Sequence, residues 1–282
     1  MPELPEVEVL ARYLDSLLKG RVIRHVKVHR AKSIRPTIDG TFSKRLTGSR
    51  ILGVGRRAKF LLFHLRKGDK EPYILLGHLG MTGRMYVQRA GRDLPKHTAV
   101  SFRLNRGEFV FEDTRYFGRM TLEVDVMNKL GPEPLREGFN GEILFEALRN
   151  CRQAIKPKLL DQTLLAGVGN IYASEALWYA RISPRKIARR LTRAHCEALA
   201  VSIVKVLTEA IKQGSTVPLD FSGDGDGDGL FYYGSQDKEG EYEERLMVYG
   251  WEGEPCERCG VSIRKIVQSA RSTYYCPECQ RG

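Results

Sequence analysis

The spacing of apolar residues changes twice along this chain. Between residues 5 and 19 apolar side chains recur at helical spacing, and Gly20 stands where a helix would end; they are Val7, Leu10, Leu14, Leu17 and Leu18. Short alternating or apolar runs, typical of strands, follow to about residue 126. The predicted strands are 22–28, 51–54, 60–65, 73–76, 99–104, 109–112 and 120–124. We therefore expect a helix followed by a β-sandwich or barrel.

The strand pattern stops at the turn Gly-Pro-Glu-Pro of residues 131–134. Helical spacing returns beyond it and predicts helices at 141–150, 156–163, 170–180 and 192–213. Thr192 is the expected N-cap of the last helix, and Gly214 is its expected end. The turn is therefore expected to separate an N-terminal domain from a helical one.

Length and composition predict a globular protein with a substantial core. The 282 residues are 42% hydrophobic and 28% charged, which argues against global disorder and disulfide mini-scaffolds. No apolar run approaches the about 18 residues of a membrane span, and the start of the chain lacks the basic and apolar stretches of a signal peptide. We expect a cytoplasmic protein without membrane contact.

The charge balance points to a polyanionic partner. The chain has 46 Lys and Arg against 34 Asp and Glu, a formal net charge of +12. A cation placed on a phosphate releases a condensed counterion, so nucleic acid is the first candidate. The alternative is a basic surface that serves solubility alone.

Four of the six cysteines have the spacing of a zinc site. Cys256-x2-Cys259 and Cys276-x2-Cys279 are separated by sixteen residues, and strands are expected at 262–267 and 272–275. Four thiolates leave no open coordination position, so we expect one structural Zn²⁺; two disulfides are the alternative that a cytosolic setting disfavours. Basic residues outnumber acidic ones around the hairpin and predict a nucleic-acid clamp: Arg258, Arg264, Lys265, Arg271 and Arg281.

A Gly-Asp repeat at residues 223–229 predicts a mobile loop. Asp224, Asp226 and Asp228 match the first half of an EF-hand loop, but Ser235 stands where a bidentate Glu belongs. Calcium binding is therefore disfavoured.

Sequence motifs of one family occur in its order along essentially the whole chain. They are PELPEVE at 2–8, RRAKFLL at 56–62, HLGMTG at 78–83, DTRYFG at 113–118, GPEPL at 131–135, AGVGNIYASE at 166–175, and the cysteine finger. By these motifs the chain resembles the bacterial formamidopyrimidine-DNA glycosylases, which are bifunctional base-excision repair enzymes.

The resemblance implies an α+β fold with three parts. A β-sandwich flanked by helices would form the catalytic domain, residues 1–131. A helix-two-turn-helix domain with a lesion-capping loop would span 132–245, and a zinc finger 246–282. It also implies a monomer acting on damaged double-stranded DNA, associated with the bacterial nucleoid.

The N-terminus is the expected nucleophile. Schiff-base chemistry needs an unprotonated amine, and an α-amine, with a pKa of about 7.7–8.0, supplies hundreds of times more of that form than a lysine at about 10.4. Removal of Met1 would expose the secondary amine of Pro2, which would attack C1′ of the damaged nucleotide. By resemblance Glu3 is the acid and base, Lys59 donates a proton or contacts phosphate during β-elimination, and Arg271 acts at δ-elimination. The alternative for Glu3 is an acid that only interacts with the helix dipole, and the alternative for Lys59 is a solvated strand lysine.

The remaining predicted site residues contact DNA. A flipped nucleotide leaves a hole, which Met81, Arg115 and Phe117 are expected to fill by resemblance; the alternative for Met81 and Phe117 is the sandwich core. Contacts to the DNA backbone are expected from Asn170, at a glycine-rich turn before a helix, and from His97, Lys156 and Arg152.

Two departures from the family concern the choice of lesion. Trp251 follows Val-Tyr-Gly where relatives usually have Arg, and the Gly-Asp repeat changes the lesion-capping loop. The hypothesis is excision of oxidised purines, 8-oxoguanine and formamidopyrimidines. The alternatives are an endonuclease VIII-like enzyme for oxidised pyrimidines, which Leu4 speaks against, and a non-catalytic zinc-finger protein that binds damaged DNA.

Overall fold

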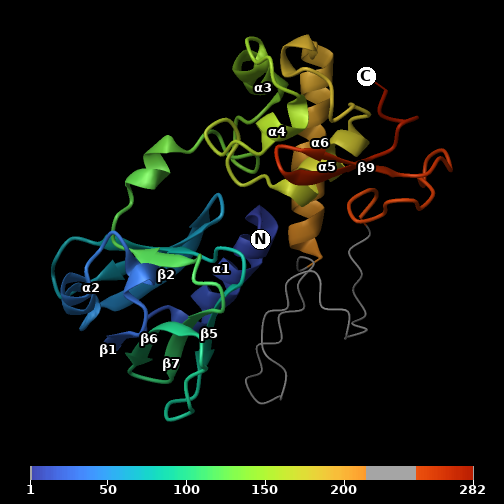
Figure 1. Cartoon of the computed structure of the whole chain (residues 1–282). Coiled ribbons are helices and arrows are strands. Elements are labelled where there is room, and N and C mark those ends of the chain that lie inside the picture. Colours follow the sequence, from blue (N-terminus) through green and yellow to red (C-terminus); the bar gives the residue numbers. More distant parts are fainter. Residues whose placement is uncertain (1, 214–245, 282) are drawn as a thin grey trace. The chain divides into compact units, whose positions relative to one another are not determined.

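The computed structural model describes residues 2–213 and 246–281, which form two compact units (Figure 1). Unit 1 comprises residues 2–128, and unit 2 comprises residues 129–213 and 246–281. Each unit is described by itself. The three domains expected from the sequence, with boundaries after residues 131 and 245, stay a prediction.

Unit 1 is a β-sandwich flanked by helices, as the sequence predicted. Its two antiparallel sheets have the strand orders β1-β6-β7-β5 and β2-β3-β4-β8. The elements are α1 (Leu4–Leu18), β1 (Ile23–Val28), η1 (Ala31–Ile34), α2 (Asp39–Leu46), β2 (Arg50–Arg57), β3 (Phe60–Arg66), β4 (Tyr73–His78), β5 (Gly83–Gln88), β6 (Thr98–Leu104), β7 (Glu108–Asp113), β8 (Arg119–Thr121) and η2 (Asp125–Lys129), which ends at the start of unit 2.

One hydrophobic core joins both sheets and the two α-helices. Leu10 and Leu14 of α1 and Phe42 of α2 are fully buried with Phe63 and Phe111 of the two sheets. The helical spacing of apolar residues at the start of the chain therefore reflects burial of one face of α1 against the sandwich.

Four elements of unit 1 were absent from the sequence prediction: the short 3-10 helices η1 and η2, helix α2 and strand β5. In α2 only Phe42 and Leu46 are buried, which is too sparse an apolar pattern to identify a helix. In β5 both faces are at least half-buried, so polar Arg84 does not mark a solvent face and no alternation is visible. The last strand is also shorter than expected and ends at Thr121.

Unit 2 contains the predicted helices and the finger hairpin. The elements are α3 (Gly141–Leu148), α4 (Ile155–Leu159), α5 (Asn170–Tyr179), η3 (Ala188–Arg190), α6 (Arg193–Lys212), β9 (Arg264–Gln268) and β10 (Arg271–Tyr275). Thr192 is the N-cap of α6, as predicted, because its hydroxyl accepts a hydrogen bond from the His195 amide.

Helix α4 ends four residues earlier than predicted because of the turn that follows it. The Asp161 carboxylate accepts hydrogen bonds from the amide and hydroxyl of Thr163, at 2.9 and 2.7 Å. Such local side-chain bonds compete with the helical hydrogen-bond pattern. The chain therefore leaves the helix after Leu159.

Several predictions fall on residues outside the described ranges: Met1, the Gly214 helix end and the Gly-Asp repeat at 223–229. Among the residues that are described, none of the helices has the length and apolarity needed to cross a membrane.

Candidate functional site

Pro2 and Glu3 lie at the start of helix α1 and are both buried. Glu3 is the N-cap residue and is 3% exposed. Its backbone amide donates to the Glu6 carboxylate at 2.7 Å, so Glu6 closes the first turn of the helix. The N-terminal residues are thereby held by the helix that follows them.

Lys59 is one of two residues that turn β2 into β3. The other, Ala58, has a left-handed backbone with φ of 53°, which costs a non-glycine residue roughly 1 kcal/mol. Arg56 braces this turn: its guanidinium donates to the Ala58 carbonyl at 3.0 Å and to Glu8 on α1 at 2.7 Å. The turn that carries Lys59 is therefore tied to the helix that carries Glu3.

The Glu8–Arg56 ion pair is an internal one, because the Arg56 side chain is 6% exposed. Burial raises the pKa of Glu8, but the hydrogen bonds and charges of Arg56 and then Arg12 outweigh it and hold this pKa below its usual value. This carboxylate positions an arginine and holds two elements together.

His78 lies opposite Phe60 in the β3–β4 pair, one residue from Lys59. Burial, the Lys59 charge and the Arg119 charge lower the pKa of His78 to about 4. Its Nδ1 accepts a hydrogen bond from the Gly80 amide at 3.2 Å. The ring is therefore neutral near pH 7 and orients the loop that leads to Met81.

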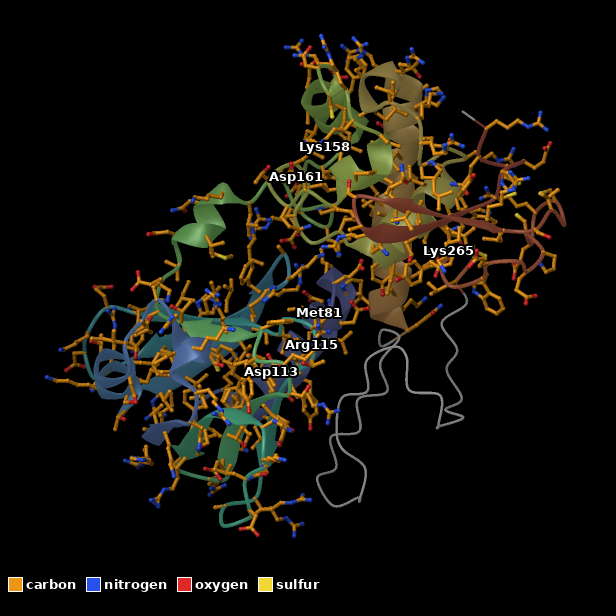
Figure 2. All side chains as sticks on the ribbon, viewed as in Figure 1. Met81, Asp113, Arg115, Lys158, Asp161 and Lys265 are labelled. Carbon is orange, nitrogen blue, oxygen red and sulfur yellow. The ribbon has the colours of Figure 1, made fainter. Side chains whose placement is uncertain are left out.

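Met81, Arg115 and Phe117 lie on two loops between the sheets of unit 1, 79–82 and 114–118. Met81 and Phe117 are 41% and 49% exposed, so the alternative that places them in the sandwich core is wrong. The Arg115 guanidinium carbon lies 5.0 Å from the centroid of the Phe117 ring. The structure thus brings two apolar side chains and a cation to the surface on neighbouring loops; Met81 and Arg115 are labelled in Figure 2.

His97 supports the second of these loops. Its Nδ1 lies 3.3 Å from the Tyr116 hydroxyl, and its carbonyl accepts the Asp113 amide. The Arg30 guanidinium carbon lies 4.9 Å from the Tyr116 ring centroid. Tyr116, which has a left-handed φ of 52°, is therefore held by two polar partners beside the exposed residues.

In unit 2 the Lys156 amino group is enclosed by protein acceptors. It donates to Asn170 Oδ1 at 2.7 Å, the Ser272 carbonyl at 2.8 Å and Thr273 Oγ1 at 2.9 Å, and the residue is 1% exposed. Asn170 in turn donates to the same Ser272 carbonyl at 3.0 Å. Lys156 thus joins α4, the start of α5 and the finger strand β10.

Of the other predicted site residues of unit 2, Asn170 is a partner of this buried amine and Arg271 is the neighbour of one. Asn170 is the first residue of α5, and Gln162 holds the preceding turn by accepting from Gly167 and donating to Val168. Arg271 precedes Ser272, begins β10 and is exposed, as is Arg152. Lys156 therefore holds both Asn170, which it contacts directly, and the Ser272 backbone next to Arg271.

The four predicted metal ligands come together. The sulfur atoms of Cys256, Cys259, Cys276 and Cys279 all lie within 4.8 Å of one another. Tetrahedral Zn²⁺ with bonds of about 2.3 Å needs sulfurs about 3.8 Å apart, and two of the pairs are separated by 3.5 and 4.0 Å. These distances suit one structural zinc, and the four are free thiols, so the disulfide alternative is wrong.

Arg258, one of the basic residues of the expected nucleic-acid clamp, is partly exposed and packs against helix α5. Its guanidinium carbon lies 3.6 Å from the centroid of the Trp178 ring, and it donates to the Trp178 carbonyl at 2.6 Å. The Trp178 indole N–H in turn points at Cys256 Sγ, 3.5 Å away. Helix α5 therefore contacts the metal site directly.

Glu175 is a structural residue to which the sequence assigned no role. Its carboxylate accepts hydrogen bonds from the amides of Met247, Val248 and Tyr249 at 2.7–3.0 Å. Burial raises its pKa, and these three bonds oppose that shift. Glu175 thus holds the segment before the finger against α5, and no local pattern could have indicated a partner more than 70 residues away.

Comparison with known proteins gives one family over nearly the whole chain. Three profiles match in order: the formamidopyrimidine-DNA glycosylase N-terminal domain at 1–120, the formamidopyrimidine-DNA glycosylase H2TH domain at 130–220, and a zinc finger found in FPG and IleRS at 253–282. Formamidopyrimidine-DNA glycosylase of Pelotomaculum thermopropionicum is 44% identical over 290 residues, covering 100% of this chain and 99% of the relative.

Solved structures of the Lactococcus lactis glycosylase have the same fold. Its complex with Fapy-dG-containing DNA is 34% identical with a TM-score of 0.85, covering 99% of this chain and 100% of that one. Its complex with DNA containing an oxidised pyrimidine is 33% identical with a TM-score of 0.86, covering both chains completely.

Proposed function

The chain belongs to the formamidopyrimidine-DNA glycosylase family, and from that membership we propose that it excises oxidised purines from duplex DNA and then cuts the abasic strand. The observation that carries the proposal is a full-length match combined with a buried Pro2-Glu3 start on α1, the helix that Arg56 ties to the Lys59 turn. The substrate class follows the Fapy-dG bound to the Lactococcus lactis enzyme.

In the proposed reaction Pro2 is the nucleophile. After Met1 is removed, its neutral secondary amine attacks C1′, the glycosidic bond breaks and the base leaves with a proton. Opening of the sugar gives an iminium that draws electrons from C2′. Loss of a C2′ proton then expels the 3′ phosphate by β-elimination, and δ-elimination releases the 5′ phosphate.

The proposal assigns the proton transfers to three further residues. Glu3 protonates the ring oxygen as the sugar opens, and the carboxylate that remains then acts as a base. Lys59 donates a proton or binds phosphate during β-elimination. Arg271 acts at the second elimination, supported by the β10 strand that Lys156 binds.

Met81, Arg115 and Phe117 are proposed to fill the space that the flipped nucleotide leaves. Two apolar side chains can replace lost base stacking, and a guanidinium can hydrogen-bond the unpaired base. Their exposure on adjacent loops supports this role.

Asn170, Arg152 and His97 are proposed to contact the DNA backbone. Lys156 also stays a predicted DNA contact, but its amino group is enclosed by protein and binds Asn170. This arrangement favours an indirect contribution of Lys156 to DNA binding, through the position of Asn170. The zinc would hold the finger hairpin in shape without taking part in the reaction. We further propose a monomer associated with the bacterial nucleoid and divided into domains after residues 131 and 245.

Borohydride trapping on an 8-oxoguanine:cytosine duplex tests this function. The borohydride reduces the iminium to a stable amine, so the wild-type protein should form a covalent adduct that peptide mass mapping places on Pro2. Intact mass must show that Met1 is absent. A preparation that retains Met1 is the matched control, because its Pro2 nitrogen is an amide.

The same assay separates the alternatives. No adduct from protein that begins at Pro2 would indicate a non-catalytic binder. An adduct with thymine glycol but not with 8-oxoguanine would indicate an enzyme for oxidised pyrimidines. The structure of the Lactococcus lactis enzyme has been solved in complex with DNA containing an oxidised pyrimidine.

A further inference from the structure

The two loops that carry the exposed residues of unit 1 run side by side from one sheet to the other. Loop 79–82 joins β4 to β5, and loop 114–118 joins β7 to β8. His78 pairs with Arg119 at one end, and Gly83 pairs with Asp113 at the other. Both ends of both loops are therefore fixed by strand pairing.

Between those ends the loop backbones touch. A Cβ at Gly80 would lie 2.5 Å from the Gly118 nitrogen, and one at Gly118 would lie 2.9 Å from the His78 carbonyl oxygen. Gly80 also has a left-handed φ of 64°. This close approach requires glycine at both positions and leaves little freedom for one loop to move without the other.

Asp113 links the two loops through a single buried carboxylate. Its Oδ1 accepts the Thr82 hydroxyl at 2.5 Å and the Arg115 amide at 3.1 Å, and its Oδ2 accepts the Gly118 amide at 2.7 Å. The residue is completely buried. Figure 2 shows Asp113 with Met81 and Arg115 on this part of unit 1.

We infer that Asp113 is a positioning residue: it holds Met81, Arg115 and Phe117 in their exposed arrangement before DNA arrives. This inference rests on the proposed function. The bond to Thr82 fixes the residue after Met81, and the bonds to Arg115 and Gly118 fix both sides of the Phe117 turn. We call Met81, Arg115 and Phe117 the wedge. Because the wedge is ordered in advance, its loops need not lose conformational entropy when the nucleotide flips.

Asparagine cannot replace this carboxylate. Its amide group offers one oxygen in place of two, so in either orientation its NH₂ faces a backbone N–H, that of Gly118 or that of Arg115. Asp113→Asn therefore removes one bond and adds a donor–donor contact while keeping the volume of the side chain.

The experiment compares two substrates that differ in whether a hole must be filled. In duplex DNA with 8-oxoguanine opposite cytosine, the wedge must enter the helix. In a single-stranded abasic oligonucleotide there is neither a base to excise nor an unpaired partner. Asp113→Asn should lower the single-turnover excision rate on the duplex about tenfold or more and leave borohydride trapping on the single strand within about twofold of wild type.

A direct readout of the wedge accompanies the rates. A 2-aminopurine placed beside the lesion brightens when stacking is broken, and this signal should rise more slowly with Asp113→Asn. Phe117→Ala should give the same substrate-selective profile. Thr82→Val removes the hydroxyl that donates to Asp113 and that accepts the Arg115 amide at 3.3 Å, but it leaves the Asp113 carboxylate bonded to the Arg115 and Gly118 amides. It should give a smaller effect, and Thr82→Ser, which keeps the hydroxyl, should behave as wild type.

Asp15→Asn is the matched control, because Asp15 also accepts a backbone amide in unit 1, that of Val54 at 2.7 Å. It should leave both activities and the fluorescence unchanged. Equal duplex rates for wild type and Asp113→Asn, or an equal loss on both substrates, would overturn the inference. Absence of any wild-type adduct would instead refute the proposed function.

Discussion

The enclosed amine of Lys156 gives a sharp prediction about the stability of unit 2. Lys156→Met keeps most of the aliphatic stem and removes the amino group, which donates to three acceptors. The Ser272 carbonyl retains a donor in the Asn170 amide. Asn170 Oδ1 and Thr273 Oγ1 lose this donor, and each such loss costs about 1–3 kcal/mol, partly offset by removal of the buried charge.

We therefore expect a loss of about 3 kcal/mol in the free energy of unfolding. Lys158→Met is the matched control in the same helix. Lys158 binds Asp161 at 2.6 Å, but both side chains are partly exposed, at 22% and 35%, and such pairs contribute about 0–1 kcal/mol. Figure 2 shows this pair on unit 2.

Urea unfolding followed by tryptophan emission measures the difference. Both tryptophans of the chain, Trp178 and Trp251, belong to unit 2, so the signal reports that unit. With a slope of about 2 kcal/mol per molar urea, Lys156→Met should lower the midpoint by about 1.5 M and Lys158→Met by less than about 0.5 M. Both samples are kept zinc-saturated. Equal midpoints for the two variants, at unchanged slope, would refute the reasoning.

Three further predictions follow from single sites. Cys276→Ser should release zinc, measured by metal analysis, and weaken DNA binding while unit 1 stays folded; unchanged zinc content and affinity would contradict it. The lowered pKa of His78 means that the unfolded chain binds more protons than the folded chain between about pH 4 and 6.5, so folding stability is lost as pH falls through that window. NMR titration should show the His78 ring still neutral at pH 5.5, and a titration midpoint near 6.5 would contradict this. Ser269 and Ala270 form the β9–β10 turn with φ of 49° and 57°, so Ser269→Asn with Ala270→Gly should raise stability by about 1 kcal/mol in urea unfolding, and a loss would contradict it.

The sequence by itself determined the features that depend on local spacing. The face of α1, the cap of α6 at Thr192, the sandwich strands other than β5 and the spacing of the zinc ligands could be identified, because periodicity, capping and chelation act over a few residues. Elements with few buried residues, such as α2, could not.

Tertiary structure decided what the polar residues do. Lys156 meets Ser272 across 116 residues, Glu175 meets Val248 across 73, and Arg258 meets the Trp178 carbonyl across 80. A buried polar group must find a partner wherever the fold brings one, and that partner leaves no mark in the neighbouring sequence. Asp113 stands within a recognised motif, yet its part in joining two loops could be seen only once both sheets were in place.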